Sequence, residues 1–586
     1  MPLPLTTILS ALALALACMP PAAAATGSTA TVREEIQALR DTTAGQWAQM
    51  MTPAGDFQNP FPADLASGHG AFVPPLLVYS LQRAGQVAPA ERAWPRAVDP
   101  VRASSFDMIG AAYAYRVLPL SGERREKLYG YMSRYGIPVT GYSCLSVPTC
   151  YGNLRLVDAL AVIAITGDGV RAADPSARLG DPVAARAAAA HVVNRWIGKV
   201  VDHGLRARIA GARMRGSLLS DPQLNTTAYH ALSAFMLSEA IRLLGRQASR
   251  KARRVSRETL DTLAALVAPD GDMSYLGRGQ GQTWVPALVA GAMANGAREA
   301  AARAKPVRAA RYLAVAQRAV RRLARLHVSP QGLLLVPGAR STVAGIDHYA
   351  HTVAYNGLAL FGLTVALDAL DATPEIPVGR MPAEQRLTVQ DSGMSGLGVV
   401  STRRVWMAVH RKPTAVTDLR YDAGVLALKR RTRHGWVDLL APRPLAMLAP
   451  NTAGPALMYR GRPVPPRGYQ IKVRGRTITA GGGYRLGPRW LRGARFRWTA
   501  TRRGVRLSMS GARRGDRFRM RAYTPAATGR ARRRTLRAAG ARWRFDRPIL
   551  VRRVRGYHSG PVEQLDALEA RFTAPASGRF VVNIGI

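Results

Sequence analysis

Residues 373–385, TPEIPVGRMPAEQ, divide the chain into two parts of different composition. Before this stretch, alanine and leucine dominate, and apolar residues recur at the spacing of amphipathic helices. After it, short segments that alternate or are rich in β-branched residues are bounded by turn residues. The two parts therefore predict two different folds.

Short Gly, Pro and Asp segments such as ITGDGV (165–170) separate the helical stretches of the first part. Stretches with helical spacing include 87–117, 154–166, 182–201, 226–246, 284–303, 306–327 and 351–370. The pattern is typical of stacked helical hairpins, several of which would close into a toroid or a superhelix. We expect an (α/α) toroid over residues 26–374.

The second part, residues 375–586, predicts an antiparallel β-sandwich. Its short segments come about every ten residues, as in small antiparallel β-domains. Examples are VWMAVHR (405–411), YQIKVRG (469–475) and RFVVNIGI (579–586). The chain as a whole is thus predicted to be an α+β protein of two domains.

The positive charge is concentrated in the second part. The chain has 83 Lys and Arg against 36 Asp and Glu, a net charge of +47. From Arg380 onward, 44 basic and 10 acidic residues give +34, and ARRRTLR (531–537) is the densest cluster. Such a charge predicts attraction to polyanions, and we expect an acidic polysaccharide or an anionic cell-wall polymer as partner.

Residues 1–25 have the pattern of a secretory signal. An apolar run from Leu9 to Ala17 precedes the small residues Ala23–Ala25, so cleavage is expected near Ala25 and the mature protein outside the cytoplasm. The run is too short to span a bilayer, and no later stretch predicts a membrane span. Export makes nucleic acid an improbable natural partner. It also favours a disulfide between Cys144 and Cys150 in CLSVPTC.

The first candidate site segment is SDPQLNTTAYHALSAF (220–235), which contains Asn225, Tyr229 and His230. Ser220 and Asp221 indicate a helix start, with Asn225 near the first turn. An exposed Asn there can bind a substrate carboxylate, helped by the helix dipole. The alternative is that Asn225 caps the helix and His230 packs in the core.

The second segment is the glycine-rich loop PDGDMSYLGRGQGQTW (269–284). Its glycines allow a ligand to approach the backbone closely. Its polar and aromatic side chains suit a sugar, which stacks on an aromatic ring while Arg and Gln bind its hydroxyl or carboxylate groups. The candidates are Tyr275, Arg278, Gln280, Gln282 and Trp284. The alternative is a purely structural loop.

The third segment is GIDHYAHTVAYNGLALFGL (345–363). His348, His351 and Tyr355 share one face at helical spacing, and Asn356 follows. We expect these residues to face substrate rather than a metal, because HxxH without a third ligand is a weak zinc signal. The sequence has no HExxH motif and no EF-hand loop, and no cofactor is expected.

With its signal, helical domain and basic β-domain, the chain resembles the chondroitin AC, hyaluronate and alginate lyases and the heparinase II/III-like proteins. DGDMSY (270–275) is similar to a loop of the first group, and Asn225 lies about 50 residues upstream, as the carboxylate-neutralising Asn does there. The resemblance implies β-elimination at a uronic acid. In such a reaction Asn, Gln or Arg neutralises the carboxylate, and Tyr or His removes the C5 proton.

The resemblance gives each candidate a role. Asn225 and Gln280 would neutralise the uronate, and Tyr275 or His348 would be the base. Arg278 would lower the pKa of Tyr275, and Tyr355 or His351 would lie beside the leaving group. Two alternatives remain: a toroidal glycoside hydrolase using Asp270, Asp272 or Asp347 as carboxylates, and a polysaccharide-binding protein without activity.

Overall fold

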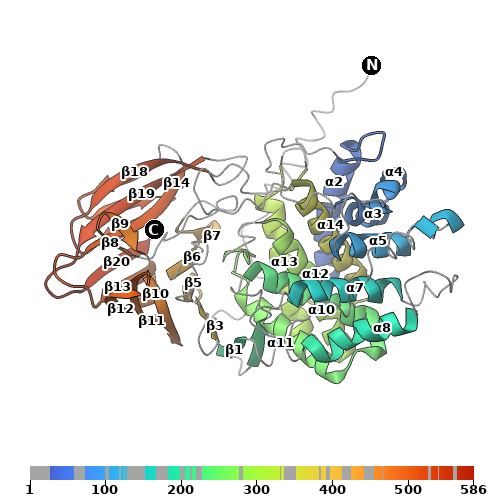
Figure 1. Cartoon of the computed structure of the whole chain (residues 1–586), viewed down its shortest axis with the longest axis horizontal. Helices are drawn as coiled ribbons and strands as arrows, with labels where there is room; N and C mark the ends of the chain where they lie inside the picture. The colour runs from blue at the N-terminus through green and yellow to red at the C-terminus, as the bar shows by residue number, and fades with distance from the viewer. Residues whose placement is uncertain are drawn as a thin grey trace, which may run out of the picture.

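A computed structural model shows the chain as a helical domain joined to a β-domain (Figure 1). It describes residues 27–57, 73–98, 105–117, 121–124, 126–127, 152–166, 182–197, 205–210, 214–218, 227–275, 282–329, 332–334, 352–381, 385–390, 396–411, 424–440, 455–464, 466–525, 529–538, 540–558 and 564–586. The predicted signal (1–25) and both Cys144 and Cys150 lie outside these residues. None of the described helices is long and apolar enough to cross a bilayer.

The helical domain is a closed ring. Each helix of the inner ring contacts the next, and the last contacts the first. In that order the described inner helices are α3 (Val73–Arg83), α5 (Ser105–Val117), α7 (Gly152–Ile165), α10 (Thr227–Leu244), α12 (Trp284–Ala302) and α14 (Thr352–Asp371). The expected (α/α) toroid is confirmed.

A second layer of helices surrounds this ring. The outer helices are α2 (Thr29–Gln49), α4 (Val87–Val98), α8 (Pro182–His191), α11 (Arg250–Leu266) and α13 (Pro306–Leu326). Taken in this order, they pack mainly against the inner helices α14, α3, α7, α10 and α12. A π-helical turn, Val192–Trp196, continues α8, and a 3₁₀ turn, Gly245–Gln247, follows α10.

Small residues let α12 and α14 approach closely. A Cβ on Gly291 would lie 2.5 Å from the Phe235 ring and 2.9 Å from the Gly362 carbonyl oxygen. Edge-to-face aromatic contacts fill the ring beside them: Phe361 of α14 contacts Phe235 at 5.8 Å and Tyr113 at 4.9 Å between ring centroids. Buried aromatic groups of this kind supply much of the apolar area of a core.

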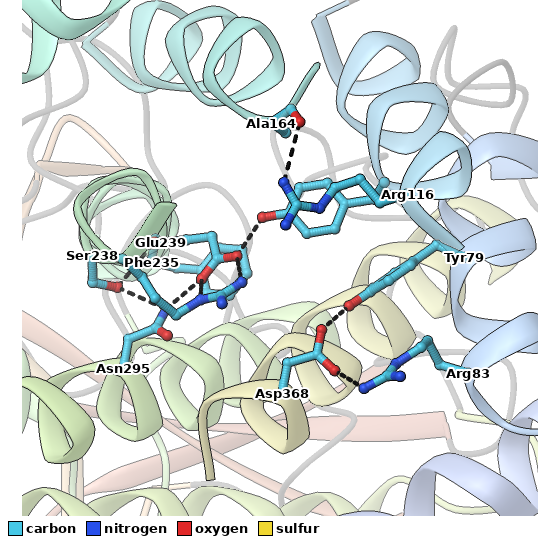
Figure 2. Close-up of polar contacts among 11 residues, drawn as sticks. Tyr79, Arg83, Arg116, Ala164, Phe235, Ser238, Glu239, Asn295 and Asp368 are labelled. Carbon is cyan, nitrogen blue, oxygen red and sulfur yellow. Dashed lines mark hydrogen bonds and ion pairs between the residues drawn. The ribbon is translucent and has the colours of Figure 1, made fainter. Parts of the chain in front are cut away.

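A buried carboxylate, Glu239 of α10, joins three inner helices (Figure 2). It accepts hydrogen bonds from the Tyr113 hydroxyl of α5 and from Asn295 Nδ2 of α12, the latter at 3.0 Å. Arg242 Nε donates to it at 2.7 Å. Burial alone would raise the pKa of Glu239, but Arg242 outweighs it, so the pKa lies below its ordinary value.

A second polar group closes the ring between its last and first helices. Asp368 of α14 accepts hydrogen bonds from Tyr79 and Arg83, both on α3 (Figure 2). The segment before α2 is tied to the segment after α14 as well. Thr29 N donates to the Ile376 carbonyl at 3.0 Å, and Ser28 forms a β-bridge with Pro377.

The β-domain contains three antiparallel sheets. The first, in spatial order, is β2 (Met214–Leu218), β1 (Leu205–Ala210), β3 (Gln385–Gln390), β4 (Gly396–Ser401), β5 (Val405–Arg411), β6 (Gly424–Thr432) and β7 (Gly435–Asp438). The second is β10 (Pro466–Arg474), β11 (Thr477–Leu486), β12 (Arg489–Ala500), β13 (Gly504–Ser510), β20 (Phe580–Gly585), β17 (Ala541–Phe545), β16 (Thr535–Ala538) and β15 (Arg530–Arg532). The third is β18 (Leu550–His558), β19 (Gln564–Thr573), β14 (Arg517–Pro525), β8 (Ala456–Tyr459) and β9 (Arg462–Val464).

The seven-stranded sheet is a middle layer, buried on both faces. Trp406 and Ala408 of β5 join the apolar core of the helical domain, whereas Met407 and Val409 join the core of the eight-stranded sheet. The five-stranded sheet packs against the same inner face of the eight-stranded sheet, where Phe518 lies 5.4 Å from Phe580 between ring centroids. The expected antiparallel sandwich is therefore confirmed, and its first sheet also joins it to the toroid.

Some elements differ from the sequence-based expectation. The stretch 87–117 forms two helices, α4 and α5, and α2, α3 and α11 were not expected. The hairpin β1–β2 lies within the helical part of the chain, yet β1 pairs with β3. At the expected domain boundary, α14 ends at Asp371 and β3 begins at Gln385.

Candidate active site

The three candidate segments meet at one end of the toroid. Trp284 begins α12, and Tyr229 and Tyr355 lie in the first turns of α10 and α14. The ring centroids of Tyr229 and Trp284 are 5.9 Å apart, and those of Trp284 and Tyr355 are 6.3 Å apart. The structure therefore brings together one candidate from each segment.

This convergence follows from the direction of the inner helices. α10, α12 and α14 contact one another at their first turns, through these aromatic rings. They also meet further along, where Glu239 of α10 contacts Asn295 of α12 and Phe235 of α10 contacts Phe361 of α14. The three helices thus run the same way. Their first turns therefore lie at the same end of the toroid.

Asn356 anchors the loop before α14. Its side chain is buried and pairs with the backbone of Leu334 twice: Leu334 N donates to Oδ1 at 3.0 Å, and Nδ2 donates to the carbonyl at 2.8 Å. An amide that replaces a strand partner in this way fixes the backbone. Asn356 was expected to bind substrate, and the structure shows its amide bonded to the backbone of Leu334.

His230 also differs from the expectation that it binds substrate. Its side chain is fully buried, and Nε2 lies 3.2 Å from the Thr259 carbonyl oxygen of α11, so this nitrogen carries the proton. Burial lowers the pKa of His230 to about 4. The imidazole is thus a neutral packing group between α10 and α11.

Tyr275, one of the two expected bases, is fully buried as well. Its hydroxyl donates to the Leu266 carbonyl at 3.0 Å, and its ring contacts Trp406 of β5 edge-to-face at 5.2 Å between centroids. A phenol that donates to a carbonyl keeps its proton. In this arrangement Tyr275 joins the helical domain to the middle sheet.

The DGD part of the same loop forms a buried ionic cluster with the β-domain. Lys429 of β6, whose side chain is 0% exposed, contacts Asp270 at 2.8 Å, Asp272 at 3.1 Å and Asp438 at 2.8 Å. Arg322 of α13 contacts Asp270 at 2.6 Å. These five residues, called the interface cluster below, join α13 and the loop to β6 and β7.

The charges of the interface cluster stabilise one another. Burial alone would raise the pKa of Asp270, but Lys429 and Arg322 outweigh it, and the pKa lies below its ordinary value. Burial alone would lower the pKa of Lys429, but Asp270, Asp272 and Asp438 outweigh it, and the pKa lies above its ordinary value. Asp270 and Lys429 therefore both stay ionised at neutral pH.

Gly271 allows the loop to turn between these carboxylates. Its φ is +88°, and an added Cβ would lie 2.2 Å from the Arg318 carbonyl oxygen of α13. Only glycine fits a backbone that is both left-handed and this close to another. The DGD sequence is thus required for docking on α13.

The remaining candidates divide into two groups. Gln282 is fully buried at the start of α12, beside Trp284. The candidates Asn225, Arg278, Gln280, His348 and His351, together with Asp347, lie outside the described residues. Within the part of the chain that the structure describes, no group of three His, Cys, Asp or Glu side chains could hold a metal ion.

No protein-family model matches the sequence, and no curated protein does. Among solved structures, heparinase III is 8% identical over 99% of this chain and 89% of its own, with a TM-score of 0.48. A chondroitin AC lyase mutant from Streptomyces coelicolor is 13% identical over 94% of this chain and 79% of its own, with a TM-score of 0.45. A possible member of the GH105 family from Salmonella enterica is 14% identical over 57% of this chain and 94% of its own, with a TM-score of 0.37. All three structures are under 15% identical to the chain and have TM-scores below 0.5.

Sequence reasoning missed the interface cluster. Lys429 lies in GVLALKRR, a pattern that predicts an exposed lysine on a strand. Asp438 follows the turn of the same hairpin. The one available signal was position: Lys429 is two residues from Ala427, on the strand face that packs against the helical core. A lysine on a buried face needs acidic partners.

Proposed function

We propose that the chain is a secreted polysaccharide lyase that cleaves a uronate-containing polysaccharide by β-elimination. The site is the end of the toroid where α10, α12 and α14 begin. The observation that carries the proposal is the convergence of Tyr229, Trp284 and Tyr355, one from each predicted segment. Aromatic rings together with amide and imidazole groups suit an acidic sugar.

The reaction needs three kinds of group. Asn225 and Gln280 hydrogen-bond the uronate carboxylate and so stabilise the negative charge that develops when C5 loses its proton. A base takes that proton, and the electron pair forms the C4–C5 double bond as the bond from C4 to O4 breaks. Tyr355 or His351 gives a proton to O4 of the leaving chain.

We assign the base to His348 rather than to Tyr275. The Tyr275 hydroxyl already donates to Leu266, and its ring is held against Trp406. An imidazole also has an ordinary pKa of about 6.5, against about 10 for a phenol, so it needs no activating cation at neutral pH. Arg278 then has the role of binding substrate carboxylate.

The hydrolase alternative has less support. Asp270 and Asp272, two of its three candidate carboxylates, are held by Lys429 in the interface cluster. Inverting hydrolysis needs two carboxyl groups about 6.5–9.5 Å apart across the bond, with one of them able to lose its proton to the leaving group. A binding protein without activity remains the second candidate, because the net charge of +47 alone favours polyanions.

The test is a panel of acidic polysaccharides incubated with the full-length mature protein. An unsaturated uronate, seen as a rise in ultraviolet absorbance, supports the lyase. New reducing ends without that absorbance would establish a hydrolase, and binding without either product would establish a binding protein. Mass spectrometry of exported material tests secretion: the mature chain should begin near Thr26 and carry a Cys144–Cys150 bridge.

A further inference from the structure

The outer face of the eight-stranded sheet is the end layer of the molecule. Its inner face packs against both other sheets, and the seven-stranded sheet separates it from the toroid (Figure 1). The burial pattern of β12 shows the two faces: Phe496 and Trp498 are buried, whereas Arg495 and Arg497 are exposed. The outer face therefore meets solvent on the side away from the toroid.

A continuous row of paired residues crosses all eight strands of this face. Its basic members, on β10, β13, β17 and β15, are all exposed: Arg474, Arg506, Arg544 and Arg532. Short polar residues on the strands between them pair with them directly: Thr477, Thr499, Asn583 and Thr535. Residues paired in this way point to the same side of a sheet. With strands about 4.8 Å apart, the row is about 34 Å long.

Parallel rows add to this charge on both sides. In one, Arg530, Arg537 and Arg542 are paired on three neighbouring strands and are all exposed. In another, Lys472 and Arg497 are separated by a single threonine on β11. The nine basic residues of these rows, together with Arg495, are called the basic face below.

The acidic side chains of this domain are engaged elsewhere. Within the described residues, Asp438 pairs with Lys429, and the others pair with arginines outside the basic face: Asp516 with Arg492, Asp546 with Arg547, Asp566 with Arg553, and Glu569 with Arg519, Arg521 and Arg571. No ion pair is seen for the basic face in this part of the chain. Like charges directly opposite on neighbouring strands, as Arg530, Arg537 and Arg542 are, destabilise a sheet, so the fold alone does not favour that row.

We propose that the basic face binds a linear acidic polysaccharide at a site separate from the cleavage site. A flat row about 34 Å long suits an extended polyanion. The Thr, Ser and Asn side chains between the arginines offer hydrogen bonds to hydroxyl and carboxylate groups. The choice of polysaccharide over nucleic acid rests on the proposed function. A long polymer held here stays near the cleavage site of the same molecule, whereas a short oligosaccharide gains nothing.

The test compares two charge-matched variants of the full-length protein. One replaces three members of the basic face, as Arg497→Gln, Arg506→Gln and Arg544→Gln. The control replaces three exposed arginines near the start of α11, as Arg246→Gln, Arg250→Gln and Arg254→Gln. Both lose three charges, and thermal unfolding checks that both fold. Binding to immobilised long-chain heparan sulfate, chondroitin sulfate, hyaluronate and duplex DNA is measured at several salt concentrations.

The basic-face variant should bind its preferred long polysaccharide about tenfold more weakly, with a shallower salt dependence, and should cleave short oligosaccharides at the wild-type rate. The control should bind like the wild type. Equal losses in both variants would mean that binding follows net charge, which overturns the proposal. DNA that binds more tightly than every polysaccharide and displaces it also overturns it. Face-dependent binding by a wild-type protein that cleaves nothing supports the basic face and refutes the proposed lyase.

Discussion

The polar side-chain atoms of Asn356 and Tyr275 both form hydrogen bonds with backbone groups. Asn356 pairs with Leu334, and Tyr275 donates to Leu266. The sequence places both residues in polar, aromatic segments, which is why a substrate role was expected. It could not show the backbone groups that pair with them, because which backbone groups lie nearby depends on how the rest of the chain folds. Trp284 and Tyr355, in contrast, lie beside each other at the start of their helices.

Two substitutions separate the candidate bases. His348→Ala should keep substrate binding and lose turnover by about 10²–10⁴, the usual effect of removing a general base. Tyr275→Phe should keep turnover and lose about 1 kcal/mol of stability, because it removes one hydrogen bond to Leu266. Initial rates and urea unfolding measure both. Loss of turnover in Tyr275→Phe with His348→Ala active would reverse the assignment.

His230 should make the helical domain sensitive to acid. The unfolded state takes up a proton near the ordinary pKa of 6.5, but the folded state does so only at about 4. Stability is therefore complete above pH 6.5 and falls as the pH drops to 4, by about 3 kcal/mol. His230→Gln should flatten urea-unfolding stability over this range. The exposed His434→Gln is the control and should keep the wild-type slope.

The helices and strands differ in how accurately the sequence predicted them. The sequence predicted four helices to within two residues at each end: α10, α12, α13 and α14. Each has a long apolar periodicity, which can be recognised from that segment of sequence alone. The hairpin β1–β2 was missed, because β1 pairs with β3, more than 170 residues later in the chain. The strands β4 and β5 are buried on both faces. Their apolar residues indicated strands, but the sequence did not show that the toroid covers one face of them.

Replacing Gly271 should lower the folding stability by more than its positive φ alone implies. Gly271→Ala should cost about 2–5 kcal/mol of stability, because it adds a clash with the Arg318 carbonyl to the strain of a left-handed residue. Gly85→Ala is the control: its φ is +76°, but an added Cβ meets nothing within 4 Å. It should cost about 1–2 kcal/mol. If both variants lost the same stability in urea unfolding, α13 would have to move away and relieve the clash with the Arg318 carbonyl.

Across the whole molecule, the interface cluster should control how the two domains hold together. Lys429→Met removes a buried cation that contacts Asp270, Asp272 and Asp438, and should cost about 3–5 kcal/mol. Lys472→Met, an exposed lysine of the same domain, should cost under about 0.5 kcal/mol. Urea unfolding with domain-specific proteolysis measures both. A loss below about 1 kcal/mol in Lys429→Met would mean that the cluster does not hold the interface.

The same cluster predicts a pH window. The pKa of Asp270 lies below its ordinary 3.8, so its contribution is complete above that value and is lost as the pH falls further. The pKa of Lys429 lies above its ordinary 10.5, so its contribution is complete below that value and is lost as the pH rises further. Proteolysis between the domains should therefore stay slow from about pH 5 to 10 and accelerate outside this range.

The tie between the two ends of the toroid also constrains how the chain can fold. Thr29 Oγ1 donates to the Pro374 carbonyl at 3.0 Å across 345 residues of sequence, and α14 lies between α12 and α3. Such high contact order slows folding. At about 5–20 residues per second, α3 and α12 are synthesised well before α14, and their apolar faces have no partner until it emerges. A chain that ends before Thr352 should therefore aggregate instead of forming a smaller ring.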